Sequence, residues 1–168
     1  MAQGKWLDRT FALSLPVTSF PEILGRLRRT PDRLEACVGG VSPDMLRRRA
    51  GDTWSIQENV GHLLDLEPRW DQRLDDLAAG AEILSPADLK NRKTHDAHHN
   101  SRRIQDLLRD FRDTRLRTVA RLERMDETAL SRVALHPRLR QPMSAVDLAF
   151  FVAEHDDHHL ATIAALAR

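Results

Sequence analysis

The sequence predicts an all-α fold: a four-helix bundle in a single domain, residues 1–168, with a long crossover between its second and third helices. Residues that favour helices, chiefly Leu, Ala, Arg, Asp and Glu, dominate the composition. The chain has seven glycines and a low share of Val, Ile and Thr, which argues against a β-sandwich or barrel. Two capping boxes each precede a long apolar repeat of helical period. With 168 residues, the chain is long enough to bury a sizeable core.

The first helix is expected over residues 20–38, with a break at Thr30 and Pro31. Threonine is a good helix cap, and proline is favoured at the first helical position, so a second helical piece could begin there. Gly39 and the glycine that follows it end this region.

The second helix has the clearest start in the sequence. Ser55 and Glu58 form a capping box, and Trp54 just before it is expected to act as a hydrophobic staple. Pro68 lies inside the apolar repeat and should kink the helix or open a local hydrogen bond. The helix is expected to close at Gly80.

Residues 81–100 form a connection that is long for a compact domain, and such connections are often functional. A crossover of this length can run along a bundle and make its two flanking helices parallel. The third helix is expected over about residues 101–125. Residues 126–143 contain two X-Pro steps, so we expect them to be irregular or to carry only a short turn.

The fourth helix begins at a second capping box, Ser144 and Asp147, and runs nearly to Arg168. Besides its main apolar stripe it carries a second one on the opposite side. A helix that is apolar on two sides is either deeply buried or lies at an interface, and we take this as a prediction of a homodimer. The second stripe consists of Val146, Phe150, Ala153, Leu160 and Ala164.

Charge and hydropathy exclude two classes of partner. The chain has 26 basic and 25 acidic residues, which are interleaved, so the net charge is only +1. A nucleic-acid-binding protein would concentrate its positive charge on one face. No run of about 18 apolar residues occurs, so no membrane span is expected.

The amino-terminal segment and the cysteine content indicate a cytoplasmic location. Asp8 and Arg9 interrupt the stretch in which a signal peptide would need apolar residues. Cys37 is the single cysteine, so no internal disulfide can form.

Two histidines lie in the apolar stripe of the fourth helix. His155 and His159 are four residues apart, so their side chains leave the same face one turn apart and can meet at one metal ion. One histidine in such a stripe is usually a hydrogen-bonded core residue, but two in register each need a buried polar partner, and a shared ion satisfies both. His158 competes with His159 from the flank of the stripe.

His62 is the best candidate for a third ligand, as the only histidine of the second helix and at the edge of its apolar stripe. Three protein ligands leave a position open for water or a substrate. The remaining histidines lie in polar connections, where surface roles are expected, although the long loop could bring one toward the site. They are His95, His98, His99 and His136.

Two segments resemble the signatures of the DinB-like (damage-inducible, YfiT-type) metalloenzyme superfamily, which is distinct from the DNA polymerase of that name. They are WSIQENVGHLLDLEPRWDQRL and FVAEHDDHHLATI. The resemblance implies a four-helix bundle whose metal is held by one histidine of the second helix and two of the last. Residue by residue these are His62, His155 and His159. The resemblance also implies zinc or nickel, homodimers and, for some members, transfer of a low-molecular-weight thiol.

Three functions remain open: two are reactions of a small-molecule substrate, and the third involves no catalysis. The first is a metal-dependent thiol S-transferase acting on small electrophiles. In it, Arg73 and the basic residues 90–93 could orient an acidic thiol, although such residues are more often plain surface charges. The second is a metal-dependent hydrolase, for which Glu154 or Asp157 is a candidate base that the helical wheel turns away from the histidines. The third is a non-catalytic, metal-stabilised stress-response module. No catalytic residue is assigned, and imidazole ligands alone do not identify the metal.

Overall fold

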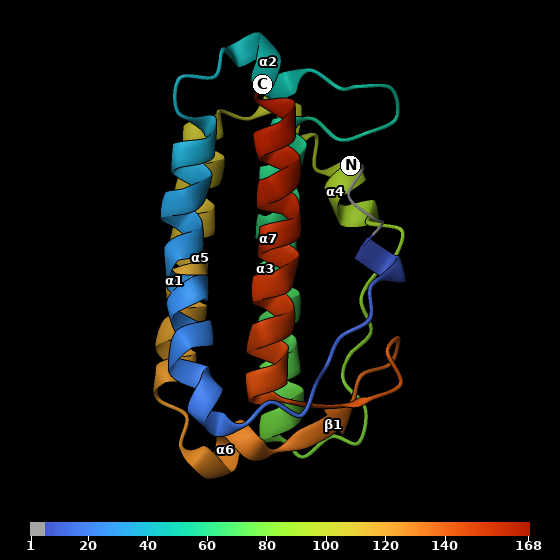
Figure 1. Cartoon of the computed structure of the whole chain (residues 1–168). Helices are drawn as coiled ribbons and strands as arrows, with labels where there is room; N and C mark the ends of the chain where they lie inside the picture. Colours follow the sequence, from blue (N-terminus) through green and yellow to red (C-terminus); the bar gives the residue numbers. More distant parts are fainter. Residues whose placement is uncertain (1–5) are drawn as a thin grey trace.

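The computed structural model describes residues 6–168, and its main feature is a bundle of four long helices (Figure 1). Helices α1 and α7 run in one direction, and α3 and α5 run in the other (Figure 1). Each helix packs against two others, α1 and α3 both contacting α5 and α7. The predicted all-α bundle with a long crossover between its second and third helices is confirmed. The four helices are α1 (Phe20–Val38), α3 (Ile56–Ala78), α5 (Ile104–Glu123) and α7 (Ala145–Leu166).

Short elements join the long helices. The first five residues of the predicted 1–168 domain lie outside the described part of the chain. None of the helices described over residues 6–168 is long and apolar enough to cross a membrane. The short helices are η1 (Trp6–Asp8), η2 (Val17–Ser19), α2 (Pro43–Arg47), α4 (Arg92–Asp96), η3 (His99–Ser101) and α6 (Glu127–Ser131).

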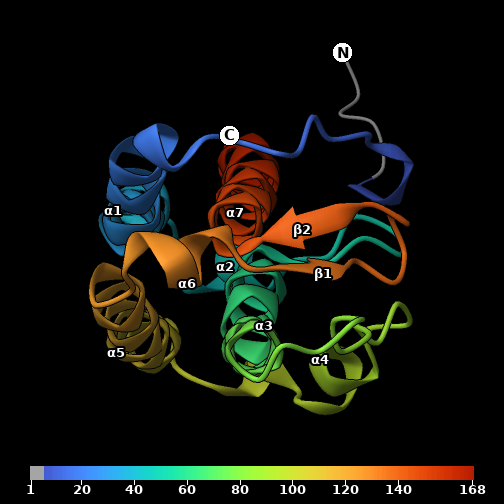
Figure 2. The ribbon, with the colours of Figure 1, turned by 90° about the horizontal axis from the view of Figure 1, so that it is seen from below.

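A small hairpin lies across one end of the bundle (Figure 2). Strands β1 (Val133–Leu135) and β2 (Pro142–Ser144) pair antiparallel, so the prediction that residues 126–143 are irregular or carry only a short turn was wrong. The strands have only three residues each, too few for an alternating pattern to stand out. The hairpin is also stabilised from outside, because the backbone of Leu135 exchanges hydrogen bonds with Glu82 and Leu84 of the crossover.

Neither internal proline interrupts its helix. Helix α1 runs continuously through Pro31, so the predicted break was wrong, and α3 likewise runs unbroken through Pro68. Thr30 does not cap a second helix. Its hydroxyl donates to Asp156 of α7 (Oγ1 to Oδ2, 2.8 Å), and both Thr30 and Pro31 are buried. Packing of α1 against α7 therefore overrides the local preference of proline to end a helix.

Both capping boxes are present. Ser55 accepts from the backbone N–H of Glu58 (3.1 Å), whose carboxylate accepts from the backbone N–H of Ser55 (2.9 Å), and Ser144 and Asp147 repeat the arrangement. Trp54 does not form the predicted staple, because the residue one turn into the helix is the polar Asn59. The indole packs instead on the ring of His62, with the centroids 4.7 Å apart.

The second apolar stripe of α7 is largely buried within this chain. Val146, Ala153 and Leu160 all belong to the core, Val146 and Ala153 in one hydrophobic cluster and Leu160 in the other. Burial in the bundle therefore accounts for most of the two-sided apolar character of α7. Homodimerisation stays a prediction, but the second apolar stripe no longer supports it.

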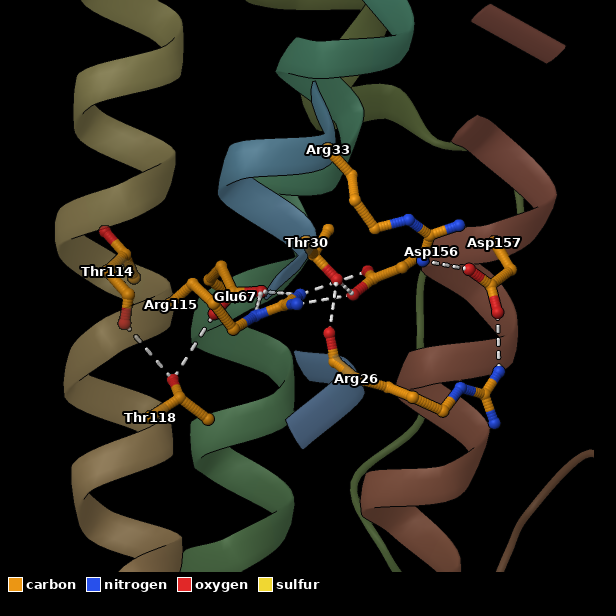
Figure 3. A network of polar contacts seen from close by, with 9 residues as sticks. All are labelled: Arg26, Thr30, Arg33, Glu67, Thr114, Arg115, Thr118, Asp156 and Asp157. Atoms are coloured by element: carbon orange, nitrogen blue, oxygen red, sulfur yellow. Dashed lines mark hydrogen bonds and ion pairs between the residues drawn. The ribbon is translucent and has the colours of Figure 1, made fainter. Parts of the chain in front are cut away.

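A buried polar network links all four long helices at mid-bundle (Figure 3). The guanidinium of Arg115 on α5 donates to Glu67 on α3 (Nη2 to Oε1, 2.7 Å) and to both carboxylate oxygens of Asp156 on α7. Asp156 also accepts from Thr30 of α1. Burial raises the pKa of Glu67 above its ordinary value, although the charge of Arg115 opposes the shift.

The crossover packs closely on α3 at Gly61. The imidazole of His99 covers this glycine and hydrogen bonds to Asp65, one turn further along (Nε2 to Oδ2, 2.8 Å). A Cβ atom at position 61 would lie 2.2 Å from Cγ of His99, so no side chain fits there without moving the ring. Gln57 holds the same segment by donating to the carbonyl of His99.

We expect Gly61→Ala to lower the free energy of unfolding by about 1–3 kcal/mol, because an overpacked contact forces the backbone or the ring to shift. Urea denaturation of the two proteins measures this difference. Gly25→Ala is the matched control, since a Cβ there meets only the flexible end of Arg29 and alanine favours a helix. Equal effects of the two substitutions would contradict the packing of His99 on α3.

Candidate metal centre

Three buried histidines meet between α3 and α7. His155 and His159 leave the same face of α7 one turn apart, as predicted, and His62 faces them from α3. One ring nitrogen of each residue lies within 4.8 Å of those of the other two. The structure thus brings together the three residues that the sequence singles out, and His158 lies outside this cluster.

The ring of His62 is oriented by a short chain of hydrogen bonds. Its Nδ1 atom lies 3.0 Å from the hydroxyl of Thr94, and that hydroxyl donates its own proton to Asp65 (3.0 Å). Since the hydroxyl proton is used, the Thr94 oxygen accepts from Nδ1–H of His62. The lone pair of Nε2 is then free, the arrangement found behind metal-binding histidines.

His159 is held in the same tautomer by a different residue. Its Nδ1 atom lies 2.8 Å from the side-chain oxygen of Asn59. The amide nitrogen of Asn59 donates to the carbonyl of Ser55 (2.8 Å), which leaves its oxygen as the acceptor. His159 therefore donates from Nδ1 and keeps the lone pair on Nε2.

His155 has an unsatisfied nitrogen. Its Nδ1 atom is buried and has no hydrogen-bond partner among residues 6–168. Aromatic rings surround it, with Trp6 packed edge-on at 5.0 Å between centroids and Trp70 at 5.9 Å. A buried polar nitrogen without a partner is rare in native proteins, and this one fits a set of imidazoles built to share a cation.

All three imidazoles are neutral at pH 7. Burial lowers the pKa of His62 to about 4. It also lowers the pKa of His155 and of His159 well below 6.5, and repulsion between the rings adds to the effect. Metal ions bind neutral imidazole, so the cluster is in the competent protonation state.

The histidines form part of the wall of a pocket of about 660 Å³. Helices α3 and α7, the crossover, the hairpin loop and the segment around Trp6 line it. This volume lies in the range of small-molecule sites. The three histidines would hold a metal ion at the wall of a largely apolar pocket. The large apolar side chains that line it are Trp6, Leu7, Trp54, Leu66, Trp70, Leu89 and Phe151.

Two histidines predicted to lie on the surface are buried. His99 packs on α3, and His136 of the hairpin lines the pocket beside Arg73, which is also buried rather than a surface charge. Sequence patterns missed these three because each is buried by a segment distant in the chain. His95 and His98 are exposed, as expected.

The two candidate bases point away from the pocket, as the helical wheel indicated. Glu154 and Asp157 both pair with Arg26 of α1 (2.6 Å each), and Figure 3 shows Asp157 also facing Arg33. Against the effect of burial, Arg26 lowers the pKa of both carboxylates, together with Arg9 for Glu154 and Arg33 for Asp157. Of the basic residues 90–93, Lys93 donates to the backbone carbonyl of Asp65 (3.1 Å) and is largely exposed.

Comparisons with known proteins support one family. The model of the DinB superfamily matches residues 26–163. The fold is similar to that of YfiT from Bacillus subtilis, described as "a probable metal-dependent hydrolase with an unusual four-helix bundle topology", with a TM-score of 0.77 and 19% sequence identity over 95% of this chain and 92% of that one. At this identity the likeness shows a common fold. No curated protein matches the chain.

Proposed function

The chain belongs to the DinB superfamily, and from this membership and the geometry of its histidines we propose that it is a divalent-metal-dependent hydrolase of a small molecule. One observation carries the proposal: three neutral, buried imidazoles converge at the wall of an apolar pocket. Among residues 6–168, no fourth His, Cys, Asp or Glu side chain joins this cluster. The description of YfiT as a probable metal-dependent hydrolase agrees with it. Zinc or nickel suits such a ligand set.

Hydrogen bonds to other residues of the chain would hold the histidine rings in place for a metal ion. A bound divalent ion supplies Lewis-acid chemistry, polarising a carbonyl or phosphoryl oxygen and acidifying water. Thr94 and Asn59 hold His62 and His159 with Nε2 available, so little rearrangement is needed when an ion binds.

His158 is our candidate for the proton acceptor in hydrolysis. It lines the pocket next to His159, with the ring centroids 5.3 Å apart, and its buried Nδ1 has no hydrogen-bond partner in the described part of the chain. Burial, and to a lesser extent the charge of Arg9, lowers its pKa below 6.5. The ring is therefore neutral at pH 7, the form in which an imidazole can act as a base.

The test is hydrolysis of p-nitrophenyl esters, anilides and phosphoesters by protein loaded with zinc or nickel. We expect turnover that requires the metal, that His62→Ala abolishes, and that His158→Gln lowers in kcat by about 10²–10⁴-fold while metal content is unchanged. His98→Gln, at an exposed histidine, is the control and should keep full activity. Turnover that survives both chelation and His62→Ala would contradict the proposal.

A thiol S-transferase is the second candidate. Its support is the absence of a suitable carboxylate base: among residues 6–168, Asp88 is the one carboxylate that lines the pocket, and it is exposed and accepts from the backbone of Lys90 and Arg92. A thiol needs no such base once it is bound as thiolate. Metal-dependent conjugation of bacillithiol, mycothiol or glutathione to monobromobimane, insensitive to His158→Gln, would favour this candidate.

A third outcome is also informative. If the protein binds one metal ion per chain and shows neither hydrolysis nor conjugation, we would assign it as a non-catalytic, metal-stabilised binding module.

A further inference from the structure

Two arginines face the pocket at the end remote from the metal centre. Arg73 follows His62 by eleven positions on α3, which is roughly 16 Å along the helix axis at 1.5 Å per residue. Arg138 reaches the same end from the loop of the hairpin. Neither arginine forms an ion pair with any acidic residue of the described chain.

Arg73 is a buried cation that forms no ion pair with any of the described residues 6–168. Its side chain is 1% exposed, and Nε donates to the backbone carbonyl of Ser85 (3.0 Å). Asp76 is near enough to act on Arg73, but its carboxylate accepts from the backbone N–H of Ser85 (2.6 Å) and from the Ser85 hydroxyl instead. Burial lowers the pKa of Arg73 to about 10, so the group still carries its charge at pH 7. A buried charge without a hydrogen-bonded counter-ion is costly, so an anionic ligand that paired with Arg73 would offset this cost.

His136 faces Arg73 with a donor rather than an acceptor. The backbone N–H groups of Arg138 and Leu139 both point at its Nδ1 (3.2 and 3.1 Å), so Nδ1 is the acceptor. Burial lowers the pKa of His136 to about 4, and the neutral ring then carries its one proton on Nε2. That N–H lies 3.1 Å from Nη1 of Arg73, itself a donor, so the pair lacks an acceptor.

Arg138 completes the group of donors. Its Nη1 donates to the backbone carbonyl of Leu7 (3.0 Å), whereas Nη2 is buried and has no hydrogen-bond partner among residues 6–168. The walls between these donors and the metal centre are aromatic: Trp70 lies under the guanidinium of Arg73 (5.6 Å from Cζ to the ring centroid), and Phe151 packs against His136 (5.3 Å between centroids).

We propose that Arg73, His136 and Arg138 form a subsite for the anionic head group of an amphipathic small molecule. The oxygens of a carboxylate or phosphate would accept from the N–H groups that lack an acceptor, and arginine is well suited to such groups. The apolar body of the ligand lies over Trp70 and Phe151. The far end of the ligand would then be the group that reacts at the three histidines, and this part of the inference rests on the proposed function. Binding of the anion at the subsite does not depend on the proposed function.

The test is a titration with three probes that share an eight-carbon chain: octanoate, octyl phosphate and the uncharged octanamide. Isothermal titration calorimetry gives the affinities, for the wild-type protein and for His155→Ala stripped of metal. We expect an anionic probe to bind about 10–100-fold more tightly than octanamide, as charged hydrogen bonds in a buried site do. Whichever of octanoate and octyl phosphate binds more tightly identifies the head group.

Arg138→Gln should reduce this preference to less than about threefold, since the substitution removes a charged partner worth a factor of ten or more. Arg138 is only partly buried, so this variant is expected to fold, and far-ultraviolet circular dichroism checks it. Arg140→Gln, at an exposed arginine of the same loop, is the matched control and should keep the full preference.

Equal affinity for octanamide and both anions would overturn the subsite, as would an unchanged preference in Arg138→Gln. The preference should persist in metal-free His155→Ala. A protein that shows it without any metal-dependent turnover therefore supports the subsite while the proposed function fails.

Discussion

Replacing His155 with alanine is expected to abolish stoichiometric binding of a divalent metal ion. The wild-type protein should retain about one zinc ion per chain after loading and desalting, because its three neutral imidazoles are already within reach of one ion. Loss of one of three ligands should lower the affinity by more than the 10–100-fold that loss of a hydrogen-bond partner behind a ligand costs. Elemental analysis gives the stoichiometry, and competition with a chromophoric chelator gives the affinity.

Two further variants make the expectation specific. His158→Ala removes a histidine of the same helix and pocket that lies outside the cluster, so it should keep full metal content. Thr94→Val removes the hydrogen-bond acceptor of His62 and should weaken binding by about 10–100-fold. Full metal content and unchanged affinity in His155→Ala would refute the centre.

Replacing Arg115 with alanine is expected to destabilise the protein by about 3–5 kcal/mol, because it leaves two buried carboxylates without their cation. Arg115 is 1% exposed, Glu67 is 0% exposed and Asp156 is 1% exposed, so water cannot replace the lost hydrogen bonds without entering the bundle. Urea denaturation at pH 7 measures the change in the free energy of unfolding.

Arg112→Ala is the matched control for this substitution. Arg112 lies one turn before Arg115 on α5 and pairs with Asp32 and Glu35 of α1, but at the surface. Surface ion pairs contribute about 0–1 kcal/mol, so little change is expected there. Glu67→Gln should also cost less than Arg115→Ala, since glutamine keeps an acceptor for Arg115 and burial already disfavours the charged form of Glu67. Equal losses in Arg115→Ala and Arg112→Ala would contradict the role of the network.

The features that the sequence predicts correctly are local ones. The starts of α3 and α7 follow from Ser55 and Ser144, whose capping partners lie three residues away and need no tertiary contact. The pairing of His155 with His159 on one face of α7 follows from helical periodicity alone. His62 as their partner depended more on the family resemblance, since its place on the helical wheel is only marginally inward.

Contacts between distant segments decided the rest. Helix α1 continues through Pro31 because packing against α7, including the hydrogen bond from Thr30 to Asp156, outweighs the local preference of proline. Thr94 supports His62 only because the crossover folds back on α3. Arg73 and His136 share a pocket across 63 positions of sequence because the hairpin packs against α3. Helix caps and helical periodicity depend on residues within one or two turns of each other. The sequence alone therefore determines the helices and the helix face that carries the histidine pair. Burial and pairing of charged groups depend on which elements meet, so only the tertiary structure decides what surrounds the metal centre and where an anion could bind.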